Sequence, residues 1–190
     1  GVIYKAYHKR LQKEVVLKKI KRKSRDARIN RNEVDILKNL NHMYLPQVVD
    51  FFEENGEIYT AMSFIPGRSL KELMEERRQF SQRQLIRWAM QLCSALNYLH
   101  TQTPPIIHGD IKPANIMVTP RGDVCLIDFN VSFAVNGNTV LGYTEGYASP
   151  EQYIIALDSR EGRELPQYRV CYEDYSGFFA FVMTYAAVLS

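Results

Sequence analysis

Hydrophobic, β-branched runs are concentrated in the first third of the chain, where they predict two β-hairpins. The runs cover residues 2–7, 15–20, 48–52 and 58–62. A polar stretch separates the first pair, and Asn55-Gly56 lies between the second pair. Asn-Gly between two such runs is a strong signal for a tight hairpin turn, because both residues tolerate a positive φ. The first third of the chain is therefore expected to be mainly β-sheet.

Between these hairpins, residues 26–40 carry hydrophobic side chains at helical spacing. The stripe consists of Ile29, Ile36, Leu37 and Leu40. Glu33 precedes three of these residues by three, four and seven positions, so its carboxylate is expected on the inward face of the helix. A carboxylate turned away from water needs a cationic partner. Lys18, near the end of the preceding strand, is the natural candidate.

After about residue 80 the hydrophobic positions change to a helical spacing. Ser81 and Gln84 predict a capping box at the start of a helix. The stripe that follows consists of Leu85, Trp88, Leu92, Leu96 and Leu99. It extends the helix to about His100, and the Pro-Pro pair at 104–105 then prevents its continuation.

Shorter elements complete this pattern. Residues 116–118 and 124–127 read as two short strands joined by a turn, and residues 63–69 contain Pro-Gly and read as a hinge. The hydrophobic run at 178–189 is shorter than a bilayer-spanning helix and is expected to form a buried one. The order of the elements predicts an α+β fold, with a β-rich first part and a helical second part.

Composition narrows the function classes. The hydrophobic content of 46% and the charged content of 24% are ordinary for a globular protein. We expect the chain to divide into two domains, residues 1–62 and 63–190. A net charge of +3 gives no indication of a nucleic-acid partner. Three widely separated cysteines favour a reducing, cytoplasmic setting over a disulfide scaffold.

Candidate catalytic chemistry is concentrated in residues 108–115, whose sequence is HGDIKPAN. Asp110 and Lys112 are expected on one loop, with Asn115 at its end. Asp128 follows the returning strand, thirteen residues after the Asn. An acid, a base and two oxygen ligands are thereby brought to one end of a strand pair. This arrangement can position a hydroxyl, a phosphate and a divalent metal ion.

The order and spacing of these residues resemble the eukaryotic-like (Hanks-type) serine/threonine protein kinases, especially the bacterial ones. The resemblance implies that Asp110 is the catalytic base and that Lys112 neutralises the transferring phosphoryl group. It implies that Asn115 and Asp128 hold Mg²⁺ ions beside ATP, and that Thr144 contacts both the base and the lysine. Catalysis in this family is mainly positioning and electrostatic stabilisation.

The same resemblance implies a two-lobed fold, with a small β-rich N-lobe containing one key helix and a larger helical C-lobe. Lys18 and Glu33 match the family's ion pair, which fixes the lysine against the phosphates. His108 matches a histidine that the family packs in its core. The remaining residues implied to surround the nucleotide are Gly1, Ile3, Val16, Met62, Ser63, Ile65 and Met117.

The chain departs from the family pattern at several points. Gly1 matches only the end of the glycine-rich loop, so the first strand is expected to be missing, as are the later C-lobe helices. Gly109 replaces an arginine that in many kinases binds a phosphate on the activation loop, which predicts a smaller role for phosphorylation of that loop. Asn130 replaces the glycine that usually follows Asp-Phe, and a less mobile loop is expected there.

Two other functions remain open from the sequence. His-Gly-Asp and Ile-Asp-Phe also occur in small-molecule phosphotransferases of related fold, which act on aminoglycosides or choline. Lys112 and the Ser-Pro-Glu at residues 149–151 favour a protein substrate that offers Ser or Thr. A non-catalytic pseudokinase fragment is the other alternative. Against it, all six residues expected to bind ATP and transfer its phosphate are present: Lys18, Glu33, Asp110, Lys112, Asn115 and Asp128.

Overall fold

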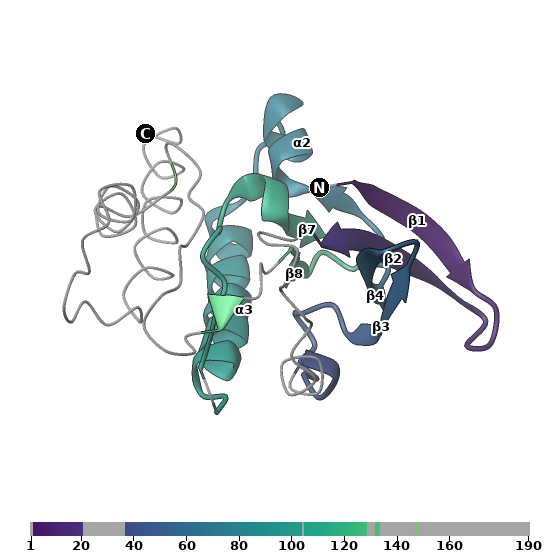
Figure 1. Ribbon diagram of the computed structural model, residues 1–190. Helices are drawn as coiled ribbons and strands as arrows, with labels where there is room; N and C mark the ends of the chain where they lie inside the picture. Colours follow the sequence, from purple (N-terminus) through teal and green to yellow (C-terminus); the bar gives the residue numbers. More distant parts are fainter. Residues whose placement is uncertain (1, 21–36, 104, 129–131, 134–146, 148–190) are drawn as a thin grey trace, which may run out of the picture. The chain divides into compact units, whose positions relative to one another are not determined.

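The computed structural model describes residues 2–20, 37–103, 105–128, 132–133 and 147. The chain divides into two compact units, Gly1–Pro66 and Gly67–Ser190. The division falls inside the 63–69 segment expected as a hinge, four residues after the end of the expected first domain. Figure 1 shows the elements of both units, and each unit is described by itself.

The first unit is built on a four-stranded antiparallel sheet. Its strands are β1 (Ile3–His8), β2 (Lys13–Ile20), β3 (Val48–Glu54) and β4 (Glu57–Ser63), in the order β1-β2-β4-β3. Both expected hairpins are confirmed. Asn55 and Gly56 form the two-residue turn between β3 and β4 with φ values of 53° and 74°. Positive φ at both positions is the geometry that follows the right-handed twist of the strands.

Cross-strand register sorts the side chains of this sheet between its two faces. Ile3 pairs with Lys18, and Val16 pairs with Met62. Directly opposed residues share a face, as do residues two apart on one strand. These four side chains therefore lie on one face. Val15, one position out of phase and thus on the other face, is buried.

The second unit combines helices with short strands. In chain order they are β5 (Arg68–Ser69), α2 (Leu70–Glu75), α3 (Gln82–His100), β6 (Ile106–Ile107), the 3₁₀ turn η1 (Pro113–Asn115), β7 (Ile116–Val118), β8 (Val124–Leu126) and β9 (Ser132–Phe133). Among the described strands, β5, β7 and β8 form one antiparallel sheet in that order, and β6 pairs with β9. The helix expected after residue 80 and both strands of the β7–β8 hairpin are thereby confirmed.

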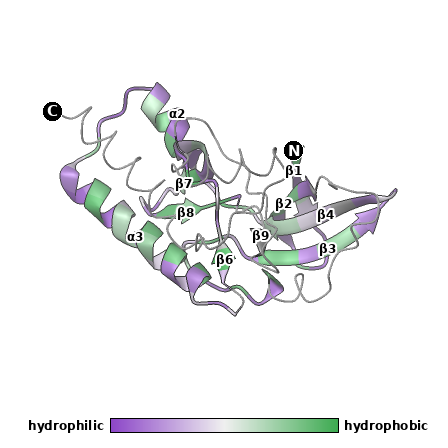
Figure 2. Cartoon of the chain, turned by 60° about the vertical axis from the view of Figure 1, so that its left-hand side comes forward, coloured by the Kyte–Doolittle hydropathy of each residue, from purple (hydrophilic) through white to green (hydrophobic). Residues whose placement is uncertain are grey.

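The core of the second unit lies where α3 packs on β8. The buried hydrophobic residues of α3 are Trp88, Leu92, Ala95, Leu96 and Leu99. Ile116 and Leu126, opposed in the β7–β8 hairpin, are fully buried too. In Figure 2 hydrophobic and hydrophilic bands alternate along α3, as expected for a helix with one covered face. This core supports the hairpin from which the candidate site projects.

Helix α2 was not expected from the sequence, where residues 63–69 read only as a hinge. Ser69 caps this helix: its Oγ accepts a hydrogen bond from the Glu72 N–H, and the Glu72 carboxylate accepts one from the Ser69 N–H. The full capping box thus lies here. At Ser81 only the half in which its Oγ accepts from the Gln84 N–H is formed.

The long helix expected at 26–40 lies mostly outside the described residues. Its described end, Leu37 and Lys38, is helical, and the side chains of Leu37 and Leu40 are buried as the sequence predicts. Lys38 Nζ lies 3.0 Å from Asp50 Oδ1 on β3. Because the ammonium stabilises the charged carboxylate, the pKa of Asp50 is lowered. The expected insert and hydrophobic helix after residue 158 lie outside the described residues.

Candidate active site

A buried histidine anchors the loop that follows β6. His108 is fully buried, its Nδ1 lies 3.3 Å from the Asp110 N, and its Nε2 lies 3.1 Å from the Ile127 carbonyl oxygen. Since Nδ1 accepts the Asp110 N–H, the ring proton is assigned to Nε2, which donates to the carbonyl. His108 therefore joins the loop to the end of β8, in agreement with its expected structural role.

Gly109 makes the turn that presents the next residue. Its φ of 70° lies in the left-handed region, where a residue with a Cβ is strained. The turn places the Asp110 N–H on the histidine of the same loop. Gly109, which stands where the family that the sequence resembles often has an arginine, thus has a conformational role that is visible in the backbone.

The Asp110 carboxylate receives two cationic or polar groups from its own loop. Lys112 Nζ lies 2.7 Å from Asp110 Oδ2, and Asn115 Nδ2 donates to the same oxygen at 3.0 Å. Asn115 Nδ2 also lies 2.8 Å from the Asp110 carbonyl oxygen. The side chains of Lys112 and Asp110 are only 23% and 15% exposed, so solvent screens their attraction incompletely. These contacts hold the carboxylate in one orientation.

The hairpin brings Asn115 next to the residue that precedes Asp128. The Ile127 N–H donates to the Asn115 carbonyl oxygen at 2.8 Å, and Asp128 follows with a φ of 64°. A non-glycine residue in this region is uncommon and marks a constrained position. The sequence-predicted residues Asp110, Lys112, Asn115 and Asp128 therefore belong to one connected group within the second unit.

The donor atoms of this group fit a magnesium ion. Both described side-chain hydrogen bonds of Asn115 use its amide nitrogen, and its amide oxygen and the Asp128 carboxylate are hard oxygen donors. The described residues contain no group of three or more His, Cys, Asp or Glu that could hold a metal by themselves. Mg²⁺ is commonly held by one or two carboxylates, with water and substrate phosphates as the other ligands. Two protein oxygens therefore suffice.

Residues predicted to surround a nucleotide are distributed over both units. Ile3, Val16, Lys18 and Met62 lie on one face of the first unit's sheet, as the register requires. Two more follow: Ser63 is the last residue of β4, and Ile65 lies two residues later. Lys18 is part-buried. In the second unit, Met117 lies on β7, opposite Cys125 and Ser69.

Burial also affects the thiol opposite Met117. Cys125 on β8 is buried among apolar residues, which raises the pKa of its thiol to about 12. Desolvation disfavours the thiolate, so this cysteine is expected to be inert at neutral pH. Cys93 and Cys125 are both free thiols.

Several predicted residues lie outside the described residues. They are Gly1, Glu33, Thr144, Asn130 and the Ser-Pro-Glu of residues 149–151. Their expected roles, including the Lys18–Glu33 ion pair, remain predictions.

One polar cluster was not recognised in the sequence. Gln91 occupies a buried position of α3, one turn after Trp88, and its side chain contacts the turn between β7 and β8. The available signal was an amide at a position where the helical stripe calls for a hydrophobic residue.

No described helix is long and apolar enough to cross a membrane.

Comparison with known proteins gives a consistent family. A model of the protein kinase domain matches residues 1–162. Serine/threonine-protein kinase Nek1 of Mus musculus is 33% identical over 145 residues, which are 73% of this chain and 12% of that protein. The probable serine/threonine-protein kinase YbdM of Bacillus subtilis is 31% identical over 137 residues, which are 70% of this chain and 52% of that protein.

A plant relative shows the same pattern. Mitogen-activated protein kinase kinase 7 of Arabidopsis thaliana is 31% identical over 162 residues, which are 80% of this chain and 51% of that protein. The chain thus spans about half the length of these shorter relatives and about an eighth of the length of Nek1.

Proposed function

Because the chain belongs to the protein kinase domain family, we propose that the protein transfers the γ-phosphoryl group of Mg-ATP to a Ser or Thr hydroxyl of a protein. Its first unit is the β-rich N-lobe, and its second unit contributes helices and the catalytic hairpin of the C-lobe. The observation that carries the proposal is the convergence of Lys112 and Asn115 on one oxygen of Asp110. A carboxylate oriented by two groups of its own loop can be positioned to accept a hydroxyl proton.

The proposed nucleotide contacts follow the faces of the two sheets. Ile3 and Val16, which share a face of the first unit's sheet, and Met117 on β7 are proposed to contact the adenine through their apolar side chains. Met62 is proposed as the gatekeeper, and the backbone from Ser63 to Ile65 as the hydrogen-bonding partner of the ring, with Gly1 at the phosphates.

The phosphate contacts involve charged and polar residues of this chain. Lys18, fixed by Glu33, binds the α- and β-phosphates in the proposal. Asn115 and Asp128 would hold Mg²⁺, which when bound neutralises charge on the phosphate oxygens. Thr144 is proposed to contact the base and the lysine of the catalytic loop.

The proposed phosphoryl transfer uses two groups of the loop that follows β6. Asp110 orients the acceptor hydroxyl and accepts its proton while the oxygen–phosphorus bond forms. The bond between the γ-phosphorus and the bridging oxygen breaks, and ADP leaves with the bonding electrons. Lys112, whose ammonium lies 2.7 Å from the same carboxylate, stabilises the negative charge on the transferring group. One loop thus supplies both the proton acceptor and the compensating positive charge.

The substrate class rests on sequence and on relatives. Lys112 within the HGDIKPAN segment and the Ser-Pro-Glu at 149–151 are the features that favour proteins over small molecules. The relatives compared above are named as protein kinases, and one of them is bacterial, which supports a role in bacterial signalling. The free thiols of Cys93 and Cys125 support a reducing, cytoplasmic setting.

A radiolabelled-phosphate assay on the full chain tests the substrate class. Wild type is offered [γ-³²P]ATP with Mg²⁺ and, separately, generic protein acceptors, an aminoglycoside and choline. We expect label on protein, recovered as phosphoserine or phosphothreonine after acid hydrolysis. Label on the aminoglycoside or choline alone would establish the small-molecule alternative, and no transfer to any acceptor would favour the pseudokinase reading.

A further inference from the structure

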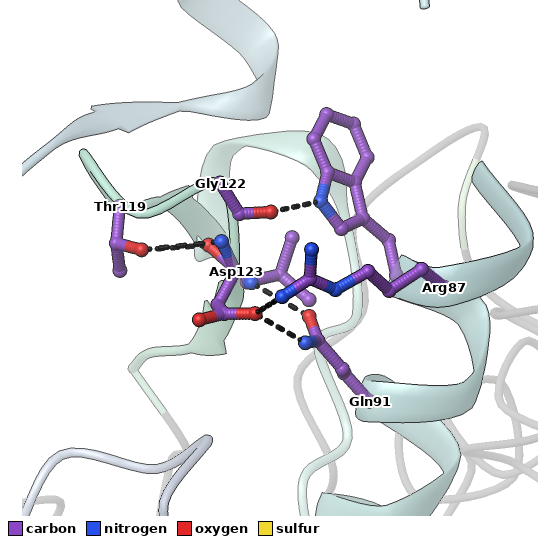
Figure 3. Close-up of polar contacts among 7 residues, drawn as sticks. Arg87, Gln91, Thr119, Gly122 and Asp123 are labelled. Atoms are coloured by element: carbon purple, nitrogen blue, oxygen red, sulfur yellow. Dashed lines mark hydrogen bonds and ion pairs between the residues drawn. The ribbon is translucent and has the colours of Figure 1, made fainter. Parts of the chain in front are cut away.

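A buried glutamine on α3 forms hydrogen bonds with the closed end of the β7–β8 hairpin. The Gln91 side chain is 6% exposed. Its Nε2 donates to Asp123 Oδ1 at 2.6 Å, and its Oε1 accepts from the Val124 N–H at 2.9 Å. Figure 3 shows the Gln91 side chain extending from the helix to Asp123 in the turn. A primary amide is the side-chain group that can donate to a carboxylate and accept from an adjacent N–H at the same time.

The register of the hairpin explains why β8 needs this partner. The pairs Thr119–Asp123 and Asn115–Ile127 are joined by backbone hydrogen bonds. Because bonded and non-bonded pairs alternate in an antiparallel ladder, the Val124 N–H points away from β7. Val124 is 1% exposed, so this N–H cannot turn to water and would lose its hydrogen bond without the glutamine.

The same helix fixes the turn at two neighbouring points. Arg87 Nη2 lies 2.5 Å from Asp123 Oδ1, the oxygen that also accepts the hydrogen bond from Gln91 Nε2. The indole N–H of Trp88 donates to the Gly122 carbonyl oxygen at 2.8 Å. Within the turn, the Thr119 N–H donates to the Asp123 carbonyl oxygen at 2.8 Å. The closed end of the hairpin is therefore attached to α3 through backbone and side chain alike (Figure 3).

The open end of the hairpin carries the residues proposed to hold Mg²⁺. β8 comprises only Val124–Leu126, and Asp128 lies two residues beyond it. The Ile127 N–H is bonded to the Asn115 carbonyl oxygen, so the two metal-binding positions are tied together at this end. Only three residues separate Val124, which bonds to Gln91, from Asp128. A displacement at the Val124 N–H therefore shifts the metal-binding end as well.

We propose that Gln91 is a positioning residue for phosphoryl transfer, acting through β8 on the metal-binding pair Asn115 and Asp128. The inference rests on the proposed function for its chemistry, but its geometry concerns this chain alone. Asp123 acts with Gln91, because it receives the glutamine's amide and fixes its orientation. Direct hydrogen-bonding partners of metal ligands commonly change metal affinity or activity about 10–100-fold when removed, and Gln91, which acts through the strand, is expected at the low end of that range.

The test uses the full chain with three variants and a matched control. Gln91→Leu removes both hydrogen bonds at similar volume. Gln91→Glu keeps an acceptor for the Val124 N–H but places a second carboxylate against Asp123. Adding Asp123→Asn to Gln91→Glu restores a hydrogen bond in the reverse direction, because the amide at position 123 now donates to the carboxylate at position 91. That carboxylate lies one helical turn from Arg87. Gln82→Leu makes the same replacement at an exposed position of the same helix.

The first readout does not depend on activity. Amide hydrogen exchange is measured at Ile127, whose N–H reports the metal-binding end, and at Glu76, whose N–H is bonded to the Glu72 carbonyl oxygen beyond the hairpin. In Gln91→Leu we expect faster exchange at Ile127, by about tenfold, with no change at Glu76. The double variant returns toward wild type, and Gln82→Leu leaves both amides unchanged. Equal acceleration at both amides, or none at Ile127, overturns the proposal.

The second readout separates positioning from stability. In the phosphate-transfer assay, Gln91→Leu is expected to raise the Mg²⁺ concentration for half-maximal rate by about tenfold, and the double variant to restore it. A role in stability alone reduces the amount of folded enzyme, which lowers the apparent kcat without moving this concentration. An unmoved Mg²⁺ dependence therefore also contradicts the proposal. If wild type transfers no phosphate, the proposed function fails, and the exchange experiment still decides the role of Gln91.

Discussion

Replacing Gly67 by alanine would force a Cβ atom into space that the backbone of β7 already occupies. The added atom would lie 2.1 Å from the Val118 carbonyl oxygen and 2.9 Å from its carbon. Gly67 also has a φ of 132°, a conformation that residues with a Cβ rarely adopt. β5 must therefore move away from β7, which disturbs the pairing of Ser69 with Met117.

The cost can be estimated from the two effects. Backbone strain contributes about 2 kcal/mol, and weakening roughly two β5–β7 hydrogen bonds contributes about 1 kcal/mol each. We expect Gly67→Ala to lower the free energy of unfolding by about 4 kcal/mol. Because Met117 is proposed to contact the adenine, nucleotide affinity should fall as well.

Two other glycines provide matched controls. Gly56 and Gly122 have positive φ values of 74° and 78°, but a Cβ at either position would meet no atom within 4 Å. Gly56→Ala and Gly122→Ala should therefore cost strain alone, about 1 kcal/mol each. Urea titration followed by circular dichroism measures all three. A loss for Gly67→Ala no larger than for the controls would refute the steric argument.

Cys125, Trp88 and Gly109 each provide a further test. Burial raises the pKa of the Cys125 thiol to about 12, so between about pH 9 and 12 the thiol ionises in the unfolded chain and stays protonated in the folded one. The free energy of unfolding should therefore fall by about 1.4 kcal/mol per pH unit more in wild type than in Cys125→Ala. Urea titrations at pH 8 and pH 10 measure this, and an equal change in wild type and Cys125→Ala would contradict it. Trp88→Phe removes the indole donor to the turn and should cost about 1–3 kcal/mol, measured by urea titration; an unchanged midpoint would show that the bond contributes nothing. Gly109 stands where many kinases have a phosphate-binding arginine. Replacing every Ser and Thr of residues 132–149 except Thr144 by alanine should therefore leave kinase activity within about threefold of wild type. Loss of all activity would show that phosphorylation of this loop is required.

Local patterns were sufficient for much of the fold. The Asn55-Gly56 turn, the hairpins beside it and the stripe of α3 each depend on residues close in sequence, and the structure has them where expected. Helix α2 was missed because the Pro-Gly before it dominated the interpretation. Its signal, Ser69 followed three residues later by Glu72, lies directly after that hinge.

The candidate site was predictable to the extent that its residues share one loop. Asp110, Lys112 and Asn115 lie within six positions, so a local turn is enough to bring them together. The contact of Gln91 with Asp123 was not predictable in this way, because 32 residues separate them and the tertiary packing of α3 on β8 creates it. An amide within a hydrophobic stripe signals a buried partner but does not identify it.

The metal-binding role of Asp128 is the central claim about the site, and one substitution tests it most directly. Asp128→Ala removes the carboxylate that follows β8, with Asp50→Ala as a control that removes a carboxylate from β3 in the other unit. The readout is Mg²⁺-dependent transfer of ³²P from ATP to protein by the full chain. We expect Asp128→Ala to lose activity by about a thousandfold or more, because phosphoryl transfer depends on metal-held charge neutralisation, while Asp50→Ala retains it. Full activity in Asp128→Ala would contradict the site assignment.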